Sequence, residues 1–145
     1  MKEDKEMINC SATVMPIYFD EENEELKIGF LRRSLDDESF SGMLVAPGGK
    51  VKEQDGELLD GVPYFSVECA CIRELMEEAS MEIERHDLFY LCSLTLPNGR
   101  VVISYYILVS ELAETLEWFN KKDIEKRQDF APGMKQEALL ALETV

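Results

Sequence analysis

Apolar and polar residues alternate in the first third of the chain in the way that β-strands require. Residues 10–19 are rich in β-branched and aromatic side chains, and residues 26–32 alternate like a half-buried strand. The acidic stretch at 20–25 is typical of a turn, so the two segments predict a hairpin. Pro16 indicates that the first strand lies at a sheet edge or carries a bulge.

Three further apolar runs predict strands. Residues 88–96 and 100–109 are joined at Pro97-Asn98-Gly99, a sequence that favours a tight turn and therefore a second hairpin. Residues 43–49 form a short apolar strand that stops at Pro47-Gly48-Gly49.

Helical periodicity is confined to two segments. Residues 66–81 carry the stronger pattern, with Ser66 as a candidate N-cap. A short segment at 117–126 precedes the second amphipathic helix, which is predicted at 134–143. The first helix therefore follows the first three predicted strands, and the second helix follows the second hairpin.

The order of these elements predicts the fold class. Residues 50–65 are polar and contain Gly56, Gly61 and Pro63, so we expect a loop between the short strand and the first helix. Strands that surround two helices indicate an α+β fold or α-β-α sandwich, in which a mixed sheet is flanked by helices. A length of 145 residues fits one domain, spanning 1–145.

Composition and charge limit the function classes. The chain is 46% hydrophobic and 31% charged, and it has no apolar run long enough to cross a membrane. No secretory signal is recognisable at residues 1–10, so a cytoplasmic protein is expected. The net charge of −15 disfavours nucleic-acid polymers and anionic membranes as partners. A small phosphorylated ligand stays open if a divalent cation bridges it.

The cysteines do not predict a zinc site. The sequence has four cysteines without a C-x2-C pair and a single histidine, which is too few ligands for such a site. We expect free, buried thiols instead, at Cys10, Cys69, Cys71 and Cys92.

Three glutamates share one face of the 66–81 helix. At about 100° per residue, Glu74, Glu77 and Glu78 fall within one arc, opposite an apolar face. Clustered carboxylates suit hard cations such as Mg²⁺, especially beside substrate phosphates. The alternative is an acidic face that is merely solvated. The upstream glycines favour the metal site, because glycine lets the backbone approach a phosphate or metal closely.

These residues resemble the signature of the Nudix hydrolase family, G-x5-E-x7-R-E-U-x-E-E-x-G-U, where U is a bulky aliphatic residue. The resemblance lies in the sequence APGGKV at 46–51 and in RELMEE at 73–78. Flanking sequences agree as well, namely FLRR at 30–33 and EWF at 117–119. The resemblance covers most of the chain and implies a Nudix-like mixed sheet flanked by helices.

The sequence departs from this signature at two places. Ten residues are inserted between Gly49 and Arg73, and the first glutamate of the signature has no clear counterpart. Six residues after Gly49 stands Asp55, and three acids of the longer loop could replace the glutamate: Glu53, Asp55 and Glu57. Ser80 occupies a position where the signature has glycine, at a helix end that often needs a left-handed residue.

The resemblance implies a metal-dependent reaction and assigns roles to residues of the signature. Mg²⁺ or Mn²⁺ would bridge a diphosphate and help to generate a water nucleophile. Glu77 and Glu78 would be the principal ligands, Glu74 a further ligand or a proton acceptor, and the Gly49 carbonyl an additional oxygen. Arg73 would orient the glutamates, although a surface ion pair is an alternative for it.

The substrate pocket is predicted with weaker signals. Nucleotides need an apolar surface for the base and donors for phosphate or ribose. From strands that line the pocket in the family, the candidates for the base are Tyr18, Phe30 and Met43, and those for phosphate or ribose are Arg32 and Arg33.

The leading interpretation is a hydrolase that cleaves the diphosphate linkage of a nucleoside diphosphate derivative, such as a nucleotide, nucleotide sugar or dinucleotide. The main alternative is a Nudix-fold module that binds or senses a nucleotide with little or no catalysis, because the first glutamate is missing and Ser80 stands in place of a glycine. A structural or interaction domain with a solvated acidic helix is a third interpretation. Dimers are common in the family, so a homodimer is left open.

Overall fold

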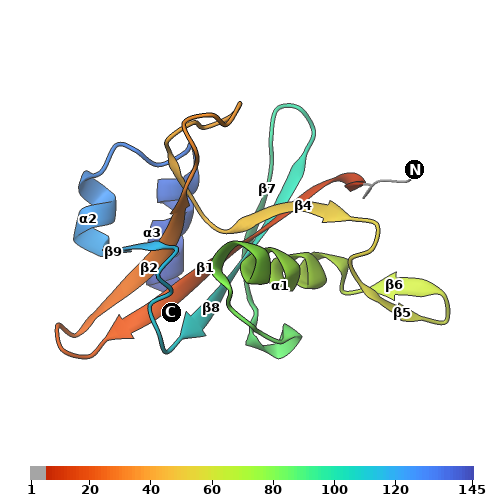
Figure 1. Ribbon diagram of the computed structural model, residues 1–145, viewed down its shortest axis with the longest axis horizontal. Coiled ribbons are helices and arrows are strands. Elements are labelled where there is room, and N and C mark those ends of the chain that lie inside the picture. The colour runs from red at the N-terminus through yellow and green to blue at the C-terminus, as the bar shows by residue number, and fades with distance from the viewer. Residues whose placement is uncertain (1–5) are drawn as a thin grey trace.

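The computed structural model describes residues 6–145. Within this range the framework is a mixed seven-stranded sheet (Figure 1). Its main path has the order β3-β2-β1-β8-β7, with β4 paired to β1 and β9 paired to β2. The strands are β1 (Glu6–Asp20), β2 (Glu25–Arg32), β3 (Leu44–Val45), β4 (Gly48–Lys52), β7 (Phe89–Thr95), β8 (Val101–Val109) and β9 (Glu117–Asn120).

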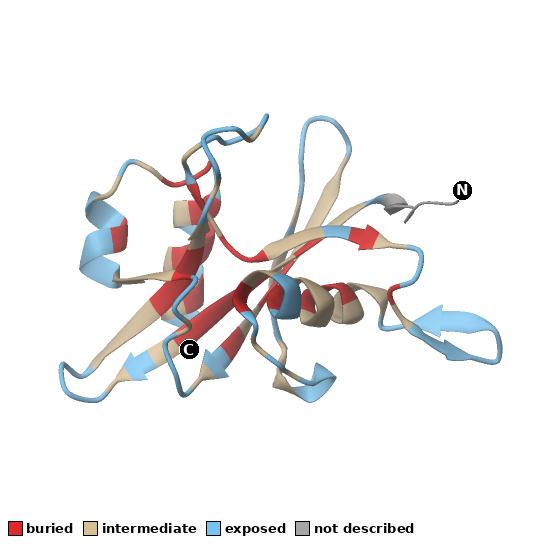
Figure 2. Cartoon of the chain, in the orientation of Figure 1, coloured by how far each residue is buried: buried red, intermediate tan, exposed pale blue. Residues whose placement is uncertain are grey.

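Helices pack on both faces of this sheet. Figure 1 shows α1 (Ser66–Ala79) in front and α3 (Met134–Thr144) behind, with α2 (Lys121–Lys126) at one side. One apolar core joins α3 and α2 to β1 and β2, and a second joins α1 to β1, β4 and β8. Figure 2 shows the buried residues on the central strands and on the helices that pack against them. The predicted sandwich of a mixed sheet flanked by helices is therefore confirmed.

Both predicted hairpins are present, since β1 pairs with β2 and β7 pairs with β8. The prediction that Pro16 marks a sheet edge or a bulge was wrong. β1 lies in the interior of the sheet, with β8 on one side and both β4 and β2 on the other. On that second side β4 pairs only up to Thr13 and β2 pairs only from Ile17. Val14 donates its backbone N–H towards this side, to the Pro47 carbonyl. The alternation of a strand directs the Pro16 nitrogen into the same gap, so its missing N–H costs no ladder bond.

The segment at 50–65 is more regular than predicted. β4 continues to Lys52, and a separate two-stranded sheet follows, formed by β5 (Glu57–Leu59) and β6 (Val62–Tyr64). Asp60 and Gly61 connect these strands with φ of 53° and 76°. Two left-handed residues are what a type I′ hairpin turn needs, and Asp-Gly between apolar residues is a strong signal for it. The prediction of a loop over residues 50–65 did not take this dipeptide into account.

Helix α1 differs from the prediction at both ends. Ser66 is its first residue, so Phe65 is the N-cap, with φ of 60° and no side-chain capping bond. The helix ends at Ala79, and Ser80 adopts a left-handed φ of 52°, as expected where the signature has glycine. Elsewhere, the 117–126 segment resolves into β9 and α2. The four cysteines are free, but only Cys71 is buried.

A buried carboxyl links α3 to the sheet. Glu137 accepts a hydrogen bond from the Ser104 hydroxyl at 2.5 Å, and Ser104 in turn lies 2.7 Å from the Thr13 hydroxyl. Burial raises the pKa of Glu137 above its ordinary value of 4.5, against the lowering effect of the Ser104 bond. The folded protein therefore binds the proton of this carboxyl more tightly than the unfolded chain does.

We expect Glu137→Gln to change how stability depends on pH. Because the folded pKa of Glu137 exceeds the unfolded one, the wild type binds more protons when folded and loses stability as pH rises from about 4.5 through the folded pKa. Glutamine keeps the acceptor for Ser104 without a charge. In urea unfolding from pH 4 to 8, the free energy of unfolding of the variant should rise relative to that of the wild type as the pH increases. A difference that stays constant with pH would contradict this prediction.

Candidate active site

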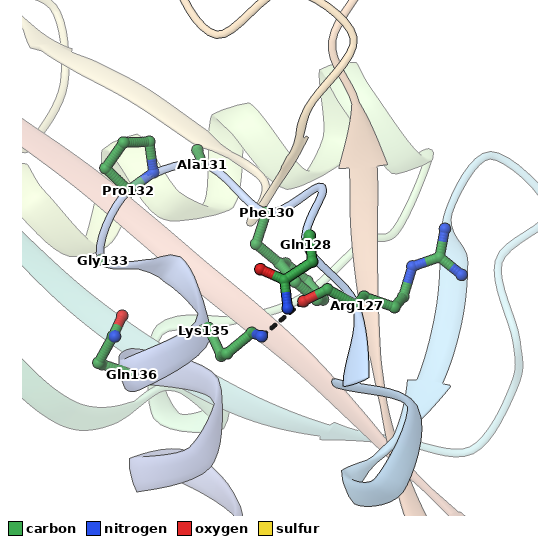
Figure 3. Close-up of a pocket in the computed structure, with 8 residues that line it drawn as sticks. All are labelled: Arg127, Gln128, Phe130, Ala131, Pro132, Gly133, Lys135 and Gln136. Atoms are coloured by element: carbon green, nitrogen blue, oxygen red, sulfur yellow. Dashed lines mark hydrogen bonds between the residues drawn. The ribbon is translucent and has the colours of Figure 1, made fainter. Parts of the chain in front are cut away.

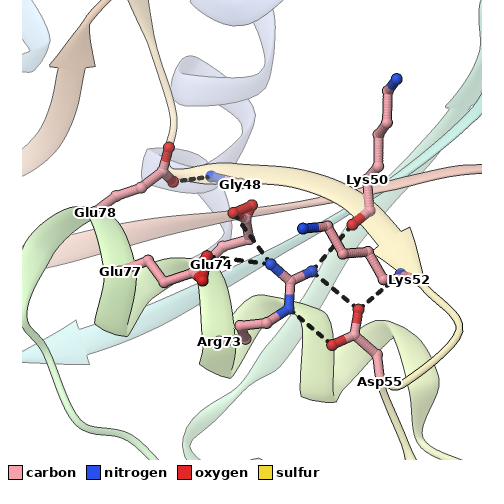
Figure 4. Close-up of polar contacts among 8 residues, drawn as sticks. All are labelled: Gly48, Lys50, Lys52, Asp55, Arg73, Glu74, Glu77 and Glu78. Carbon is pink, nitrogen blue, oxygen red and sulfur yellow. Dashed lines mark hydrogen bonds and ion pairs between the residues drawn. The ribbon is translucent and has the colours of Figure 1, made fainter. Parts of the chain in front are cut away.

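The C-terminal half of α1 places the three signature glutamates beside β4 (Figure 4). The adjoining face of the helix is anchored in the core by buried residues, namely Ala70, Cys71, Leu75 and Ala79. Because this apolar face fixes the rotation of the helix, Glu74 and Glu78 are directed towards the start of β4, where Gly48 and Gly49 lie. The predicted carboxylate face is therefore not a freely solvated one.

Glu78 is the most strongly perturbed of the three. Its Oε1 accepts the backbone N–H of Gly48 at 2.8 Å. Burial raises the pKa of Glu78 to about 7, the Gly48 bond lowers it, and the charges of Glu74 and Glu77 raise it further. Arg33 also lowers it, which indicates that this arginine acts on the site. Burial therefore outweighs the Gly48 bond and the Arg33 charge, and the carboxylate is held near its midpoint of ionisation at neutral pH.

Glu74 lies directly against Gly49. A Cβ on residue 49 would be 2.2 Å from Glu74 Oε2, so only glycine permits this approach. Burial raises the pKa of Glu74, while the nearby Arg73 lowers it and Glu77 raises it. Glu77 itself is more open, with 55% of its side chain exposed.

Replacing Gly49 by alanine is expected to separate stability from activity. The atom that a new Cβ would meet is the far end of the Glu74 side chain, which can move, and Gly49 does not have a positive φ. The free energy of unfolding should thus fall by about 1 kcal/mol or less. Displacement of the Glu74 carboxylate should lower kcat about 10–100-fold, because a shift of about 1 Å in a positioned group has that effect. Wild-type kcat in this variant would show that Glu74 need not lie against residue 49.

Arg73 connects the helix to the segment after β4. Its Nε and Nη2 donate to the two carboxylate oxygens of Asp55 at 2.9 and 3.0 Å. Nη1 contacts Glu77 Oε1 at 3.2 Å and Glu74 Oε1 at 3.5 Å, and Nη2 also donates to the Lys50 carbonyl. The expectation that Arg73 orients the glutamates agrees with these contacts, which Figure 4 draws.

Of the three acids that could replace the first signature glutamate, only Asp55 contacts Arg73. Asp55 is 4% exposed and also accepts the backbone N–H of Lys52 at 2.7 Å. Glu57 pairs instead with Arg85, and Glu53 is exposed. Asp55 stands six residues after Gly49, as the signature glutamate does. The ten inserted residues are therefore those between Asp55 and Ser66, which contain the β5–β6 hairpin.

The predicted phosphate-binding arginines differ in their surroundings. Arg32 is engaged by Glu117 at 2.8 and 3.0 Å, by Asp129 at 3.1 Å and by the Gly42 carbonyl at 2.9 Å. It joins β2 to β9 and to the segment before α3, so its guanidinium has little capacity left for a phosphate. Arg33 pairs with Asp37 at 3.2 Å and lies close enough to affect Glu78.

The predicted base-binding residues also separate. Phe30 is completely buried in the α3-side core, with its ring centroid 4.9 Å from that of Phe130, so its ring has no face open to a base. This residue was chosen wrongly, because its strand position faces the core and not the signature helix. Met43 is exposed, and Tyr18 is half-buried with an edge-on contact to Trp118. These two stay predictions.

A cavity of about 240 Å³ lies elsewhere, at the start of α3 (Figure 3). The Lys135 ammonium beside it is already bonded to the carbonyls of Glu125 and Arg127. None of the predicted site residues lines it; its walls are Arg127, Gln128, Phe130, Ala131, Pro132, Gly133, Lys135 and Gln136.

No family model matches the chain, and no curated protein matches it. Solved structures do match. A MutT/nudix family protein from Enterococcus faecalis is 20% identical with a TM-score of 0.60, over 83% of this chain and 45% of that one. The NUDIX domain of Shewanella oneidensis NrtR, complexed with ADP ribose, is 18% identical with a TM-score of 0.67, over 99% and 90%.

Shewanella oneidensis NrtR, complexed with a 27mer DNA, is 20% identical with a TM-score of 0.73, over 94% of this chain and 61% of that one. The chain thus spans about half to two thirds of the longer proteins and nearly all of the NUDIX domain. These similarities show that the chain has the Nudix fold.

Proposed function

We propose that this chain is a Nudix hydrolase that cleaves the diphosphate linkage of a nucleoside diphosphate derivative, with Mg²⁺ or Mn²⁺ as cofactor. The observation that carries the proposal is the joint placement of Glu74 and Glu78 against the Gly48-Gly49 backbone, with Arg73 held by Asp55 behind them. A solvated acidic face needs neither the burial nor this support.

The donor set fits a magnesium-type ion. Burial raises the pKa values of Glu74 and Glu78, and the charges of the neighbouring glutamates raise them further. A divalent cation bound beside them would offset this repulsion. Among the described residues no group of three acid, histidine or cysteine side chains forms a complete metal site. Mg²⁺ is commonly held by one or two carboxylates that act together with water and substrate phosphates.

In this proposal Glu77 and Glu78 would be the principal metal ligands, with the Gly49 carbonyl as a further oxygen. The metal would neutralise the diphosphate and lower the pKa of water. Glu74, whose pKa is raised by burial, would accept the proton of the attacking water. Arg73 would keep Glu74 and Glu77 oriented. Water attacks one phosphorus, the bridging P–O bond breaks, and two phosphorylated products leave.

Turnover of a substrate panel tests the proposal. Nucleoside triphosphates, ADP-ribose, dinucleoside polyphosphates, NADH and coenzyme A would be incubated with Mg²⁺, with Mn²⁺ or with EDTA. Metal-dependent release of two phosphorylated products from one compound supports hydrolysis. Absence of turnover of every compound, together with metal-dependent binding of one, would favour the second candidate below.

The second candidate is a nucleotide-binding or sensing module. It is favoured by the similarity to NrtR, of which one structure contains ADP ribose and another DNA. The net charge of −15 argues against direct contact of this chain with nucleic-acid polymers, which we propose are not its partners. No helix of the described residues is long and apolar enough to cross a membrane.

A further inference from the structure

The ten-residue insertion forms an element that the proposed reaction does not use. The β5–β6 hairpin extends from the N-terminal end of α1, away from the rest of the molecule (Figure 1). Glu78 lies near the other end of the helix, about 18 Å away along its axis at 1.5 Å per residue. The hairpin is thus remote from the carboxylates, and a different role has to account for it.

Large apolar side chains are concentrated on this hairpin. Leu58 is 73% exposed, and about half of the surface of each of three other side chains is open to solvent: Leu59, Val62 and Tyr64. Figure 2 shows the hairpin as one continuous exposed region. A two-stranded sheet gains little stability by itself, so these residues are not there to form a core. In the register of the two strands Leu59 lies opposite Val62, and Tyr64 follows on the same face, whereas Leu58 lies on the other face. We call the first of these faces the hairpin patch, consisting of Leu59, Val62 and Tyr64.

The base of the hairpin is fixed to the domain. Arg85 lies over the Phe65 ring at 3.7 Å from its centroid, and the same guanidinium pairs with Glu57 at 3.4 Å. Gly56 adopts a φ of 124°, where a Cβ would meet Ser66 Oγ at 3.0 Å. The hairpin therefore presents its patch in a defined direction. A rigid display lowers the entropic cost of binding a partner.

The charges around the patch indicate the kind of partner. Residues 53–68 contain five acidic residues and no lysine or arginine: Glu53, Asp55, Glu57, Asp60 and Glu68. Glu57 and Asp55 are paired with arginines, whereas Glu53 and Asp60 are exposed. A second copy would bring the same acids and a net charge of −15 against this surface. Pro63 on β6 also hinders edge-to-edge pairing of two hairpins.

We infer that the hairpin patch docks a basic amphipathic segment of another protein, in which apolar side chains alternate with lysine or arginine. The apolar residues of the segment cover Leu59 and Val62, and one of its cations lies beside Asp60 in the adjoining turn. Apolar burial supplies affinity, and the acidic surroundings supply selectivity for a cationic partner. This inference does not depend on the proposed hydrolysis.

A labelled synthetic peptide of twelve residues, alternating leucine and lysine, is a suitable probe for fluorescence anisotropy. We expect the double variant Leu59→Ser/Val62→Ser to bind it about tenfold more weakly than the wild type does, a loss of about 1.4 kcal/mol. The matched control is Leu35→Ser/Leu112→Ser, which removes two exposed leucines elsewhere and should change the affinity less than twofold. A peptide with glutamate in place of lysine should not bind.

Circular dichroism and turnover of any substrate found in the panel should be the same in both double variants, since all four side chains are exposed. Equal affinity of the two variants for the basic peptide would overturn the inference, because binding would then follow net charge alone. Binding of the acidic peptide would also overturn it. Sedimentation that shows a dimer of the wild type, abolished by Leu59→Ser/Val62→Ser, would assign the patch to a second copy instead.

Discussion

Glu78→Gln is expected to lower metal-dependent turnover about 10³-fold, the equivalent of about 4 kcal/mol of transition-state stabilisation. Glutamine keeps an oxygen that can accept the Gly48 N–H, which Glu78 accepts at 2.8 Å, so the geometry of the turn should survive. What the variant loses is the negative charge beside Glu74. The unfolding free energy at pH 7 should not fall, because burial already opposes ionisation of Glu78, whose pKa is about 7.

Two measurements separate the loss of metal binding from general damage. Titration with Mn²⁺ followed by calorimetry should show weaker binding in Glu78→Gln, and urea unfolding should show an unchanged or higher midpoint. Glu82→Gln is the matched control, because Glu82 is an exposed glutamate just beyond α1. It should retain wild-type turnover. If Glu78→Gln hydrolyses the substrate as fast as this control does, Glu78 is not a ligand and the proposed site is wrong.

Much of the fold follows from local patterns in the sequence. Alternation in residues 26–32 and the apolar face of residues 66–81 are each satisfied by one buried side, which is why β2 and α1 were predictable. That a proline fits at position 16 of an interior strand was not predictable. It depends on the gap between β4 and β2, which come from different parts of the chain. The prediction that Phe30 binds the base was wrong for a similar reason. The pattern of a strand shows which residues alternate, but not which of its two faces meets α1.

The candidate site was predictable where its residues are adjacent in sequence. Glu74, Glu77 and Glu78 share a helix face by spacing alone, and their signature identified them. The sequence could not identify the acid that pairs with Arg73. Counting signature positions forward from Gly49 and backward from Arg73 leads to different residues, because the hairpin is inserted between them. Only the return of the chain after the hairpin shows that Asp55 is the partner. The Asp60-Gly61 turn was the signal that could have identified the insertion as a closed hairpin.

Asp55→Ala is expected to lower the free energy of unfolding by about 3 kcal/mol, because removing one member of a buried ion pair leaves its partner uncompensated. Asp55 is 4% exposed, and its two oxygens receive Arg73 and the backbone N–H of Lys52. The variant leaves both donors without this acceptor. Arg73 retains Glu77 at 3.2 Å, which places the cost at the lower end of the range for buried pairs.

The same variant should reduce kcat about 10–100-fold, as loss of a residue that orients metal ligands commonly does. Arg73 would turn towards Glu74 and Glu77 and hold them away from the metal. Glu57→Ala is the matched control, since the Glu57–Arg85 pair is exposed, at 3.4 Å, and its loss should cost about 0.5 kcal/mol or less. Urea unfolding and steady-state kinetics on both variants measure the two effects. Equal stability of the two would mean that the Asp55–Arg73 pair does not hold α1 to β4, and the ion pair would then have no part in positioning the glutamates.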